Sequence, residues 1–301
     1  MGTPEFAVPS LERLYTAGYP VVAVVTGPDK PRGRGRVISG TPVKEVALRH
    51  ATPVLQPDVL TDPALEQEVR SLHPDLVVVV AFRILPPSLY TIPRFGSFNL
   101  HASLLPRYRG AAPINWAIIN GETETGVTTF FLEDRVDTGN IILQKRTPIG
   151  PEEDAGQLHD RLAHIGADAV LATVQAIEAG TVTVTKQDPL LASKAPKIFK
   201  DISRIDWNQP PERVRNFIRG LSPSPAAWTM HRGVLLRIFK SSYVDDSTGT
   251  PGTVTHLADE LLVQCSTGRL KILELQQEGR RRMTAEEFLR GYAIGTSDIL
   301  Q

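Results

Sequence analysis

The 301-residue chain contains a single cysteine, Cys265, which excludes an internal disulfide and a metal site built from several cysteines. Cys265 ends the predicted strand 261–265, so we expect a small filler of the core or the surface. No apolar run reaches the about 20 residues that span a bilayer. The first residues also lack the basic and then apolar profile of a signal peptide. These absences predict a soluble, cytoplasmic protein.

The chain also has no excess of either charge, because 33 Lys and Arg balance 33 Asp and Glu. Bulk charge therefore does not indicate a polyanionic partner. The distribution is less even: residues 190–301 hold 16 basic and 12 acidic side chains, and residues 1–189 hold 17 and 21. A mildly basic C-terminal part fits contact with a phosphate backbone, and chance explains the same imbalance equally well.

The N-terminal part alternates short apolar runs with segments of helical spacing, which is typical of a parallel sheet covered by helices. The runs 21–25 and 76–81 are continuously apolar, as in strands buried on both faces. Other segments are expected as helices at 4–17, 61–72 and 154–179 and as strands at 97–101 and 126–132. We predict an α/β domain over residues 1–185, with a doubly wound parallel sheet.

A loose segment over residues 186–203 predicts an interdomain linker. The remaining residues, 204–301, are expected to form a smaller OB-like β-barrel domain, because short strands alternate with turn residues. Its elements are predicted as a helix near 211–220, strands at 228–231, 234–243, 252–257, 261–264 and 270–275, and a closing helix near 284–291. Thr284 is the expected N-cap of that helix, with Glu287 at the capping-box position.

Three polar residues indicate chemistry. Asn99 and His101 stand two residues apart at the end of a predicted strand, so both side chains face the same side. Asp137 enters from another segment and can orient the imidazole. An amide donor, an imidazole and a carboxylate suit acyl or formyl transfer, which needs an oxyanion stabilised and a proton moved. Taken singly, an Asn and a His at a strand end are more often turn formers or satisfied polar groups.

No metal is expected at these positions, because His101 and Asp137 have no third ligand at metal spacing. The run Asn99-Leu100-His101-Ala102-Ser103-Leu104-Leu105-Pro106, followed by Asp137-Thr138-Gly139, resembles the folate-dependent formyltransferases. Further motifs resemble the members that act on methionyl-tRNA: Gly2-Thr3-Pro4-Glu5-Phe6-Ala7, Gly110-Ala111-Ala112-Pro113-Ile114, Ile205-Asp206-Trp207 and Arg281-Arg282-Met283-Thr284-Ala285-Glu286-Glu287-Phe288. The resemblance covers nearly the whole chain.

The resemblance implies direct transfer of the formyl group of 10-formyltetrahydrofolate to the free amino group of methionine on initiator tRNA. It also implies that Asn99, His101 and Asp137 are the catalytic residues. We expect Asn99 to donate to the oxyanion, since its amide stays neutral. His101 would donate to the same oxygen or move a proton, and Asp137 would fix the imidazole tautomer and take the amine proton, directly or through water.

By the same resemblance, two segments line the folate site: Ser103, Leu104, Leu105 and Pro106, and then Phe82, Arg83, Ile84 and Leu85. Without the resemblance, the first segment is simply a rigid loop whose leucines pack beside a proline. Many family members have a glycine where Arg83 stands and one more residue in this loop. We therefore expect the wall of the pterin pocket to differ here.

Basic residues predict contacts with tRNA. Arg32, Arg34 and Arg36 alternate with glycine and proline, which favours a flexible loop that becomes ordered on RNA. The resemblance implies that this loop enters the acceptor-stem region, with Arg34 as the main reader. Lys197 in the linker and Arg281 in the C-terminal domain are expected to steer tRNA. Residues 107–110 leave two readings open: a solvated turn, or a contact with folate glutamate or RNA phosphate.

The family places an apolar strand before the segment Gly2-Thr3-Pro4, and the first strand of a doubly wound sheet is normally central. We therefore expect Met1 to be an internal residue of a longer chain. Two other functions stay open: formylation of an amino sugar nucleotide or purine precursor, and RNA binding without catalysis. The intact trio argues against the second. We expect a monomer.

Overall fold

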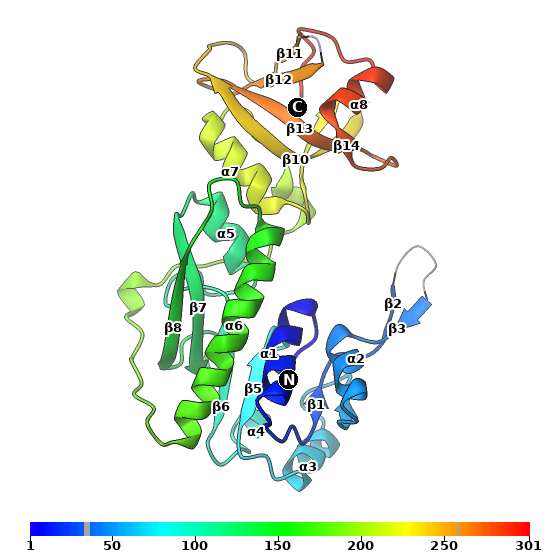
Figure 1. The fold of residues 1–301 in the computed structure, drawn as a ribbon. Helices are drawn as coiled ribbons and strands as arrows, with labels where there is room; N and C mark the ends of the chain where they lie inside the picture. Colours follow the sequence, from blue (N-terminus) through cyan, green and yellow to red (C-terminus); the bar gives the residue numbers. More distant parts are fainter. Residues whose placement is uncertain (33–36, 258) are drawn as a thin grey trace. The chain divides into compact units, whose positions relative to one another are not determined.

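The fold is described by a computed structural model that covers residues 1–32, 37–257 and 259–301 (Figure 1). The chain forms two compact units. The first contains residues Met1–Gly110, Thr125–Thr147 and His159–Lys194, and the second contains Ala111–Glu124, Pro148–Leu158 and Ala195–Gln301. The second unit thus includes two short segments from the range 1–185 that is expected to form the first domain. None of the described helices combines the length and the apolar character that a membrane span requires.

The first unit is built on an α/β sheet with strand order β5-β6-β7-β8. These strands are β5 (Val77–Val80), β6 (Ser97–His101), β7 (Glu124–Phe131) and β8 (Ile141–Pro148). β5 and β6 are parallel, whereas β6 and β7 are antiparallel, so the sheet is mixed rather than all parallel. A second parallel pair joins β1 (Val24–Val25) to β4 (Val54–Leu55). The apolar run 21–25 therefore supplies only two paired strand residues.

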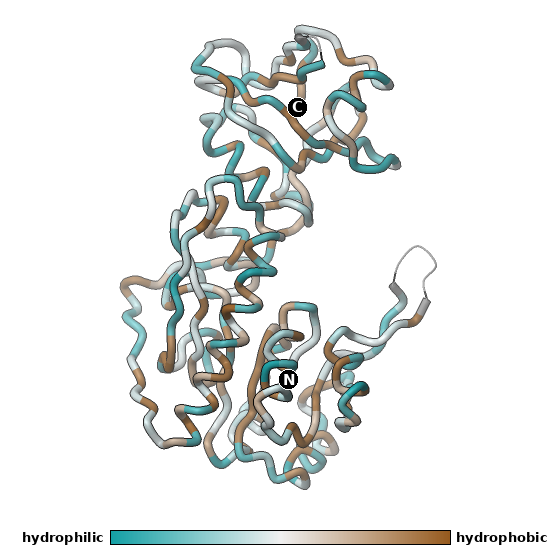
Figure 2. Tube along the Cα trace, viewed as in Figure 1, coloured by the Kyte–Doolittle hydropathy of each residue, from teal (hydrophilic) through white to brown (hydrophobic). Residues whose placement is uncertain are grey.

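Helix α6 (Ala155–Glu178) covers one face of this sheet (Figure 1). Gly166 permits a close approach, because a Cβ atom there would lie 2.6 Å from the Leu100 side chain. The hydroxyls of Thr129 and Thr173 also join β7 to α6 at 2.7 Å. The apolar residues of β5 form a continuous hydrophobic stretch in Figure 2, as expected of a strand in the core. Other elements of the unit are η1 (Glu5–Ala7), α1 (Val8–Thr16), β2 (Lys30–Arg32), β3 (Val37–Ser39), α2 (Pro42–Arg49), α3 (Pro63–Ser71), α4 (Pro87–Tyr90) and η2 (Pro189–Leu191).

The strands β2 and β3 pair as an antiparallel hairpin, with Lys30 opposite Ser39. The expectation of a flexible loop is therefore wrong at the two ends of this segment, which form strands. Two adjacent short strands satisfy each other's backbone groups even where glycine and proline are frequent nearby. Arg34 and Arg36 lie outside the described residues, and Arg32 is described by its backbone alone.

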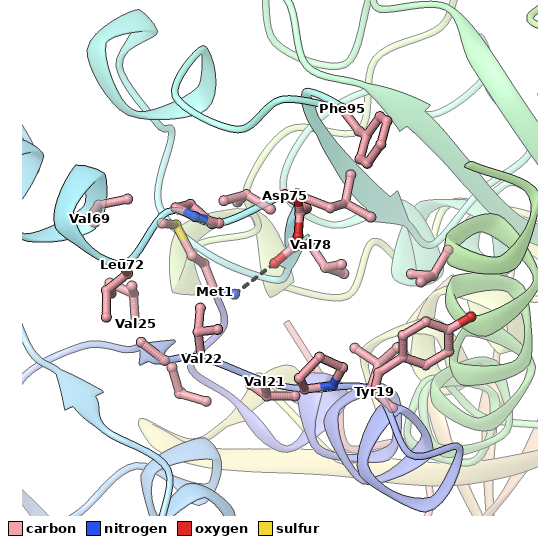
Figure 3. Close-up of a pocket in the computed structure, with 18 of the residues that line it drawn as sticks. Met1, Tyr19, Val21, Val22, Val25, Val69, Leu72, Asp75, Val78 and Phe95 are labelled. Carbon is pink, nitrogen blue, oxygen red and sulfur yellow. Dashed lines mark hydrogen bonds between the residues drawn. The ribbon is translucent and has the colours of Figure 1, made fainter. Parts of the chain in front are cut away.

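Met1 lies between the two parallel pairs (Figure 3), and the hydrogen bonds of Met1 and Gly2 join both pairs. The Gly2 amide donates to the Val25 carbonyl at 3.0 Å, and the Val80 amide donates to the Met1 carbonyl at 2.9 Å. The Met1 amine donates to the Val78 carbonyl at 2.7 Å. Beyond Met1 a mainly apolar groove of about 460 Å³ continues, lined among others by Val22, Val25, Val69, Leu72 and Phe95. The strand expected ahead of Gly2 remains a prediction.

The second unit contains an antiparallel sheet of order β11-β12-β13-β10-β9, with β14 paired to β13. Its elements are α5 (Pro113–Ile119), η3 (Lys200–Ser203), α7 (Pro211–Leu221), β9 (Ala227–His231), β10 (Val234–Asp245), β11 (Val254–Leu257), β12 (Glu260–Gln264), β13 (Arg269–Gln277), β14 (Met283–Thr284) and α8 (Ala285–Gly291). Most of the strands lie near their predicted positions. Thr284 and Glu287 form the predicted capping box at the start of α8, which confirms that helix and its cap.

The predicted OB-like barrel is not confirmed, because the sheet does not close: within the described residues the end strands β9 and β11 are not paired with each other. The last residues of the chain bond to both instead. Met230 in β9 and Gln301 exchange two backbone hydrogen bonds of 2.8 Å, and the Leu300 amide donates to the Gly252 carbonyl next to β11 at 2.9 Å. The C-terminal tail therefore satisfies the strand edges that would otherwise close the barrel.

Cys265 belongs to the core of the second unit and is fully buried among Trp207, Ile218 and Leu236 and their neighbours. Burial raises the pKa of the Cys265 thiol to about 12, so it stays protonated and unreactive near neutral pH. This confirms the expectation of a small packing residue, and it places that residue in the core rather than on the surface.

Candidate active site

Strand β6 presents Asn99 and His101 on one face of the sheet. Leu100, between them, points to the other face, where it meets Gly166 of α6. His101 is buried, with 6% of its surface exposed, and Asn99 is half-buried. Asn99 pairs in register with Val79 of β5 and Phe130 of β7. The sheet therefore holds both residues at the carboxyl end of a strand in a parallel pair, where ligands commonly bind.

The tautomer of His101 follows from its contacts. Its Nε2 atom lies 2.8 Å from the carbonyl oxygen of Tyr108, and a carbonyl can only accept, so Nε2 carries the hydrogen. In the neutral imidazole the other nitrogen, Nδ1, then has a free lone pair. Nδ1 is the nitrogen that can take up a proton. The tautomer is thus set by Tyr108, a contact that the sequence did not indicate.

Asp137 lies beside that same nitrogen. Its Oδ2 atom is 3.8 Å from Nδ1 of His101 and accepts a hydrogen bond of 2.8 Å from the Gly110 amide. The carboxylate is buried, with 9% of the residue exposed. Two of the three predicted catalytic residues, 36 positions apart in the chain, are therefore brought together by the fold. Once Nδ1 is protonated, the carboxylate stabilises the resulting cation.

The third residue, Asn99, keeps its amide available. Within the residues that the structure describes, the Asn99 side chain makes no hydrogen bond. Its position on the His101 face of β6 directs it toward the same region. An uncommitted amide donor near an imidazole and a carboxylate can stabilise a developing oxyanion while the imidazole handles a proton.

The predicted folate segment 103–106 is a tightly bonded loop. Ser103 is fully buried and donates its hydroxyl to the Arg107 carbonyl at 2.6 Å. Thr128 donates to the Ser103 carbonyl at 2.6 Å and accepts from the Leu105 amide at 3.1 Å. Leu105 is buried, whereas Leu104 and Pro106 are partly exposed and present side-chain surface. The loop is rigid, but several of its backbone groups are already used inside the protein.

The second predicted folate segment contains Phe82, Arg83, Ile84 and Leu85. Leu85 is buried, Phe82 is half-buried, and 75% of Ile84 is exposed. The Arg83 guanidinium donates to the carbonyls of Pro57 and Asp58 at 2.6 and 2.8 Å, and it lies 5.4 Å from the centre of the Phe82 ring. Arg83 thus anchors this loop to a neighbouring one, which is how the residue differs in effect from a glycine.

The basic residues predicted to meet tRNA are exposed where the structure describes their side chains. Lys197 lies 5.3 Å from the centre of the Phe199 ring. Arg281 donates to a carboxylate oxygen of Glu287 at 2.7 Å, and 71% of its side chain remains exposed. The Arg281 guanidinium is also the main reason that the pKa of Glu287 lies below its usual range.

The segment 107–110 is not a solvated turn. Tyr108 is buried, with 6% exposed, and its amide donates to the Ser193 hydroxyl at 2.8 Å. The Arg109 guanidinium donates twice to the side-chain oxygen of Gln187, at 2.6 and 3.1 Å.

The Gln144 side chain donates to the Leu105 carbonyl at 2.8 Å and to the Thr128 hydroxyl at 3.0 Å. Sequence reasoning also missed the residues that support the site from three other segments, which are Thr128, Gln144, Gln187 and Ser193. No local signal marks them, because each matters through a contact that only the tertiary fold creates.

A cavity of about 730 Å³ opens next to the Asp137 turn, lined among others by Tyr90, Arg109, Asp134, Thr138 and Gln187. None of the residues predicted to bind folate lines it. Among the described residues, no group of three His, Cys, Asp or Glu side chains is arranged to hold a metal ion.

Comparisons with known proteins bear on this site. Residues 1–174 match the family described as formyl transferase, and residues 197–293 match the formyl transferase C-terminal domain. A methionyl-tRNA formyltransferase of Caldanaerobacter subterraneus subsp. tengcongensis is 48% identical, over 100% of this chain and 98% of its own length. Another, of Chlorobium phaeovibrioides, is 52% identical over 97% of this chain and 94% of its own length.

Solved structures share the fold. WlaRD, a sugar 3N-formyl transferase solved with dTDP and 5-N-formyl-THF, has a TM-score of 0.68 at 20% identity, covering 93% of this chain and 97% of its own. HypX from Aquifex aeolicus, solved with tetrahydrofolic acid, has a TM-score of 0.61 at 20% identity, covering 84% of this chain and 47% of its own.

Proposed function

Because this chain belongs to the formyltransferase family, we propose that it transfers the formyl group of 10-formyltetrahydrofolate to the amino group of methionine on initiator tRNA, for translation initiation. The observation that carries the proposal is the near-complete coverage by methionyl-tRNA formyltransferases at about half identity. The arrangement of His101 and Asp137 supports it, because a buried carboxylate 3.8 Å from Nδ1 stabilises the imidazolium that forms when His101 takes a proton during attack on a carbonyl carbon.

Each of the three proposed catalytic residues has its own role in the reaction. The neutral amine of methionine attacks the formyl carbon, and negative charge gathers on the formyl oxygen. The Asn99 amide donates a hydrogen bond to that oxygen. The attacking nitrogen loses a proton to Nδ1 of His101, the ring nitrogen that the Tyr108 contact leaves free. The Asp137 carboxylate stabilises the imidazolium, and it is also placed to take the proton itself, directly or through water. The bond between the formyl carbon and the folate nitrogen then breaks, and the imidazolium of His101 would return the proton to that nitrogen, so that tetrahydrofolate leaves as a neutral amine.

The two predicted folate segments fit a reduced pterin in their chemistry. Each follows the carboxyl end of a strand, β5 or β6, and these strands are parallel neighbours, so both loops lie at one edge of the sheet. Partly exposed apolar surface comes from Phe82, Leu104 and Pro106, which suits a flat ring system. When bound, the folate supplies an activated formyl group. The solved relatives of this fold that hold reduced folates support the proposal.

For tRNA we propose contacts from Arg32, Arg34 and Arg36, because their sequence pattern is basic, and from Lys197 and Arg281, because exposed cations can follow a phosphate backbone. We also propose that the protein acts in the cytoplasm, as a monomer, and without a metal ion.

The test measures formyl transfer by the purified protein with three acceptors: methionyl-tRNA, an amino sugar nucleotide and a purine precursor amine. We expect turnover with methionyl-tRNA and 10-formyltetrahydrofolate only. Asn99→Ala should lower kcat by about 100-fold or more, as loss of an oxyanion donor does elsewhere, and Asp137→Asn should lower it comparably. If either small amine is formylated faster than methionyl-tRNA, the proposed substrate is wrong.

A further inference from the structure

We propose that Gln187 is a positioning residue for the reaction, which holds the turn that carries Asp137 against His101. This inference rests on the proposed function, because it gives Gln187 a role that works through the Asp137 carboxylate. Gln187 lies 50 positions from Asp137, in a segment that the sequence predicts as a linker. Nevertheless only 6% of it is exposed.

Both ends of the Gln187 amide are fully used by the site. Its nitrogen donates to the Asp137 carbonyl at 2.9 Å and to the Gly139 carbonyl at 2.8 Å. Its oxygen accepts both hydrogen bonds from the Arg109 guanidinium. This network also fixes which end of the amide is which, because carbonyls only accept and a guanidinium only donates. The side-chain amide of Gln187 therefore joins the Asp137 turn to the segment that contains Arg109.

The Asp137 turn has a conformation that needs support. Asp137 adopts a positive φ of 56°, which costs free energy in a residue with a side chain. Gly139 passes so close to Phe131 that a Cβ atom would lie 1.7 Å from its carbonyl oxygen. The Gln187 amide donates to the carbonyls of Asp137 and Gly139, on the two sides of Thr138, and so stabilises this strained turn.

The contact between Gln187 and Arg109 also bears on the Asp137 carboxylate. Gly110, the residue after Arg109, donates its amide to Oδ2 of Asp137 at 2.8 Å, and that oxygen is the one facing His101. Gln187 thus fixes the Asp137 backbone directly. Through Arg109 it also fixes the neighbouring Gly110 amide, which donates to the Asp137 carboxylate. A shift of about 1 Å at a reacting group can reduce the rate by about 100-fold.

Two substitutions separate the two ends of the amide. Gln187→Glu keeps an oxygen for Arg109 but places a carboxylate against the carbonyls of Asp137 and Gly139, so the turn loses its donors. Gln187→Met removes both contacts at similar volume. We expect kcat to fall by about 100-fold in each, with KM for methionyl-tRNA changed by less than threefold, because neither change touches the proposed tRNA residues.

The control for a purely structural effect is Gln264→Met. Gln264 is equally buried, at 6% exposed, and donates to three carbonyls, but it lies in β12 of the second unit. We expect this variant to lose thermal stability and keep kcat. If Gln264→Met and Gln187→Met lose stability and kcat in the same proportion, the effect is structural and the proposal is overturned.

Combining each Gln187 change with Asp137→Asn completes the test. If Gln187 acts through Asp137, the second change adds less than threefold to the loss caused by Asp137→Asn, whereas an independent role multiplies the two losses. Wild-type kcat in Asp137→Asn would overturn the proposed catalytic trio. A low kcat in Asp137→Asn together with wild-type kcat in both Gln187 variants would overturn the positioning role alone.

Discussion

A chain that begins at Met1 should lose stability as the pH falls from 8 to 5. The Met1 amine is enclosed by the apolar groove between the two parallel strand pairs, and burial lowers its pKa from 8.0 to about 5. In the unfolded chain the amine keeps its usual pKa and binds a proton below pH 8. Between pH 8 and pH 5 the unfolded state therefore binds more protons than the folded state, so the free energy of unfolding rises with pH.

The pKa difference sets the size of the effect. One pKa unit corresponds to about 1.4 kcal/mol, so three units give at most about 4 kcal/mol between pH 8 and pH 5. This is an upper bound, since the groove is open to solvent along part of its length and Met1 itself is only half-buried. The contribution is fully present above pH 8 and is lost as the pH approaches the folded-state pKa.

The assay compares urea unfolding of three chains at pH 5, 6, 7 and 8, after intact-mass measurement shows that Met1 is retained. One begins at Met1, one carries Gly-Ser-Gly-Ser before it, and one carries four valines. Both extensions turn the Met1 amine into an amide and should flatten the pH dependence. Only the valines should also raise stability at pH 8, because they add apolar side chains to the groove. Equal pH slopes in all three chains would refute the reasoning.

Three further changes test other parts of the chain. Arg34→Ala should raise KM for methionyl-tRNA about tenfold and leave folate affinity unchanged in a binding titration; equal use of the aminoacyl-tRNA by both proteins would contradict this. Thr284→Ala removes the hydrogen bond that the Thr284 hydroxyl accepts from the Glu287 amide in the α8 capping box and should cost about 1 kcal/mol, seen as a lower Tm without loss of kcat. Gly139→Ala brings a Cβ atom against the Phe131 carbonyl, so single-turnover formyl transfer should fall sharply, and unchanged rates would show that the turn adapts.

The sequence predicts the secondary structure best where one pattern is long and regular. Helix α6 extends over 155–178 against a predicted 154–179, because its apolar residues repeat over many turns. Helix α5 and strand β8 were not predicted, and the run 21–25 contributes only two strand residues. Strand β8 is mostly half-buried along its length, so it lacks the apolar run or clean alternation that a sequence reveals.

Closure of the sheet in the second unit could not be predicted from the sequence. Each strand of the second unit has a local signature, but whether β9 and β11 meet depends on the tail at Leu300 and Gln301, which bonds to both sides. Closure is a property of the whole sheet, and strand spacing does not report it.

The candidate site divides in the same way. Asn99, His101 and Asp137 belong to motifs that can be recognised in the sequence. In the structure, Nδ1 of His101 lies 3.8 Å from Oδ2 of Asp137. Gln187 and the Tyr108 carbonyl act only through contacts across the fold. A backbone carbonyl is present at every residue, so no sequence pattern distinguishes the one that selects a tautomer.

The tautomer of His101 determines when Asp137 helps. In the ground state Nδ1 has a lone pair, and a carboxylate oxygen 3.8 Å away offers it no hydrogen bond. After the attacking amine gives up its proton, Nδ1 is cationic and the same oxygen attracts it strongly in a buried site. The contact is therefore stronger at the transition state than in the bound substrates, which is the condition for accelerating the chemical step. Fixing Asp137 at this distance through Gln187 and Gly110 then affects kcat more than substrate affinity.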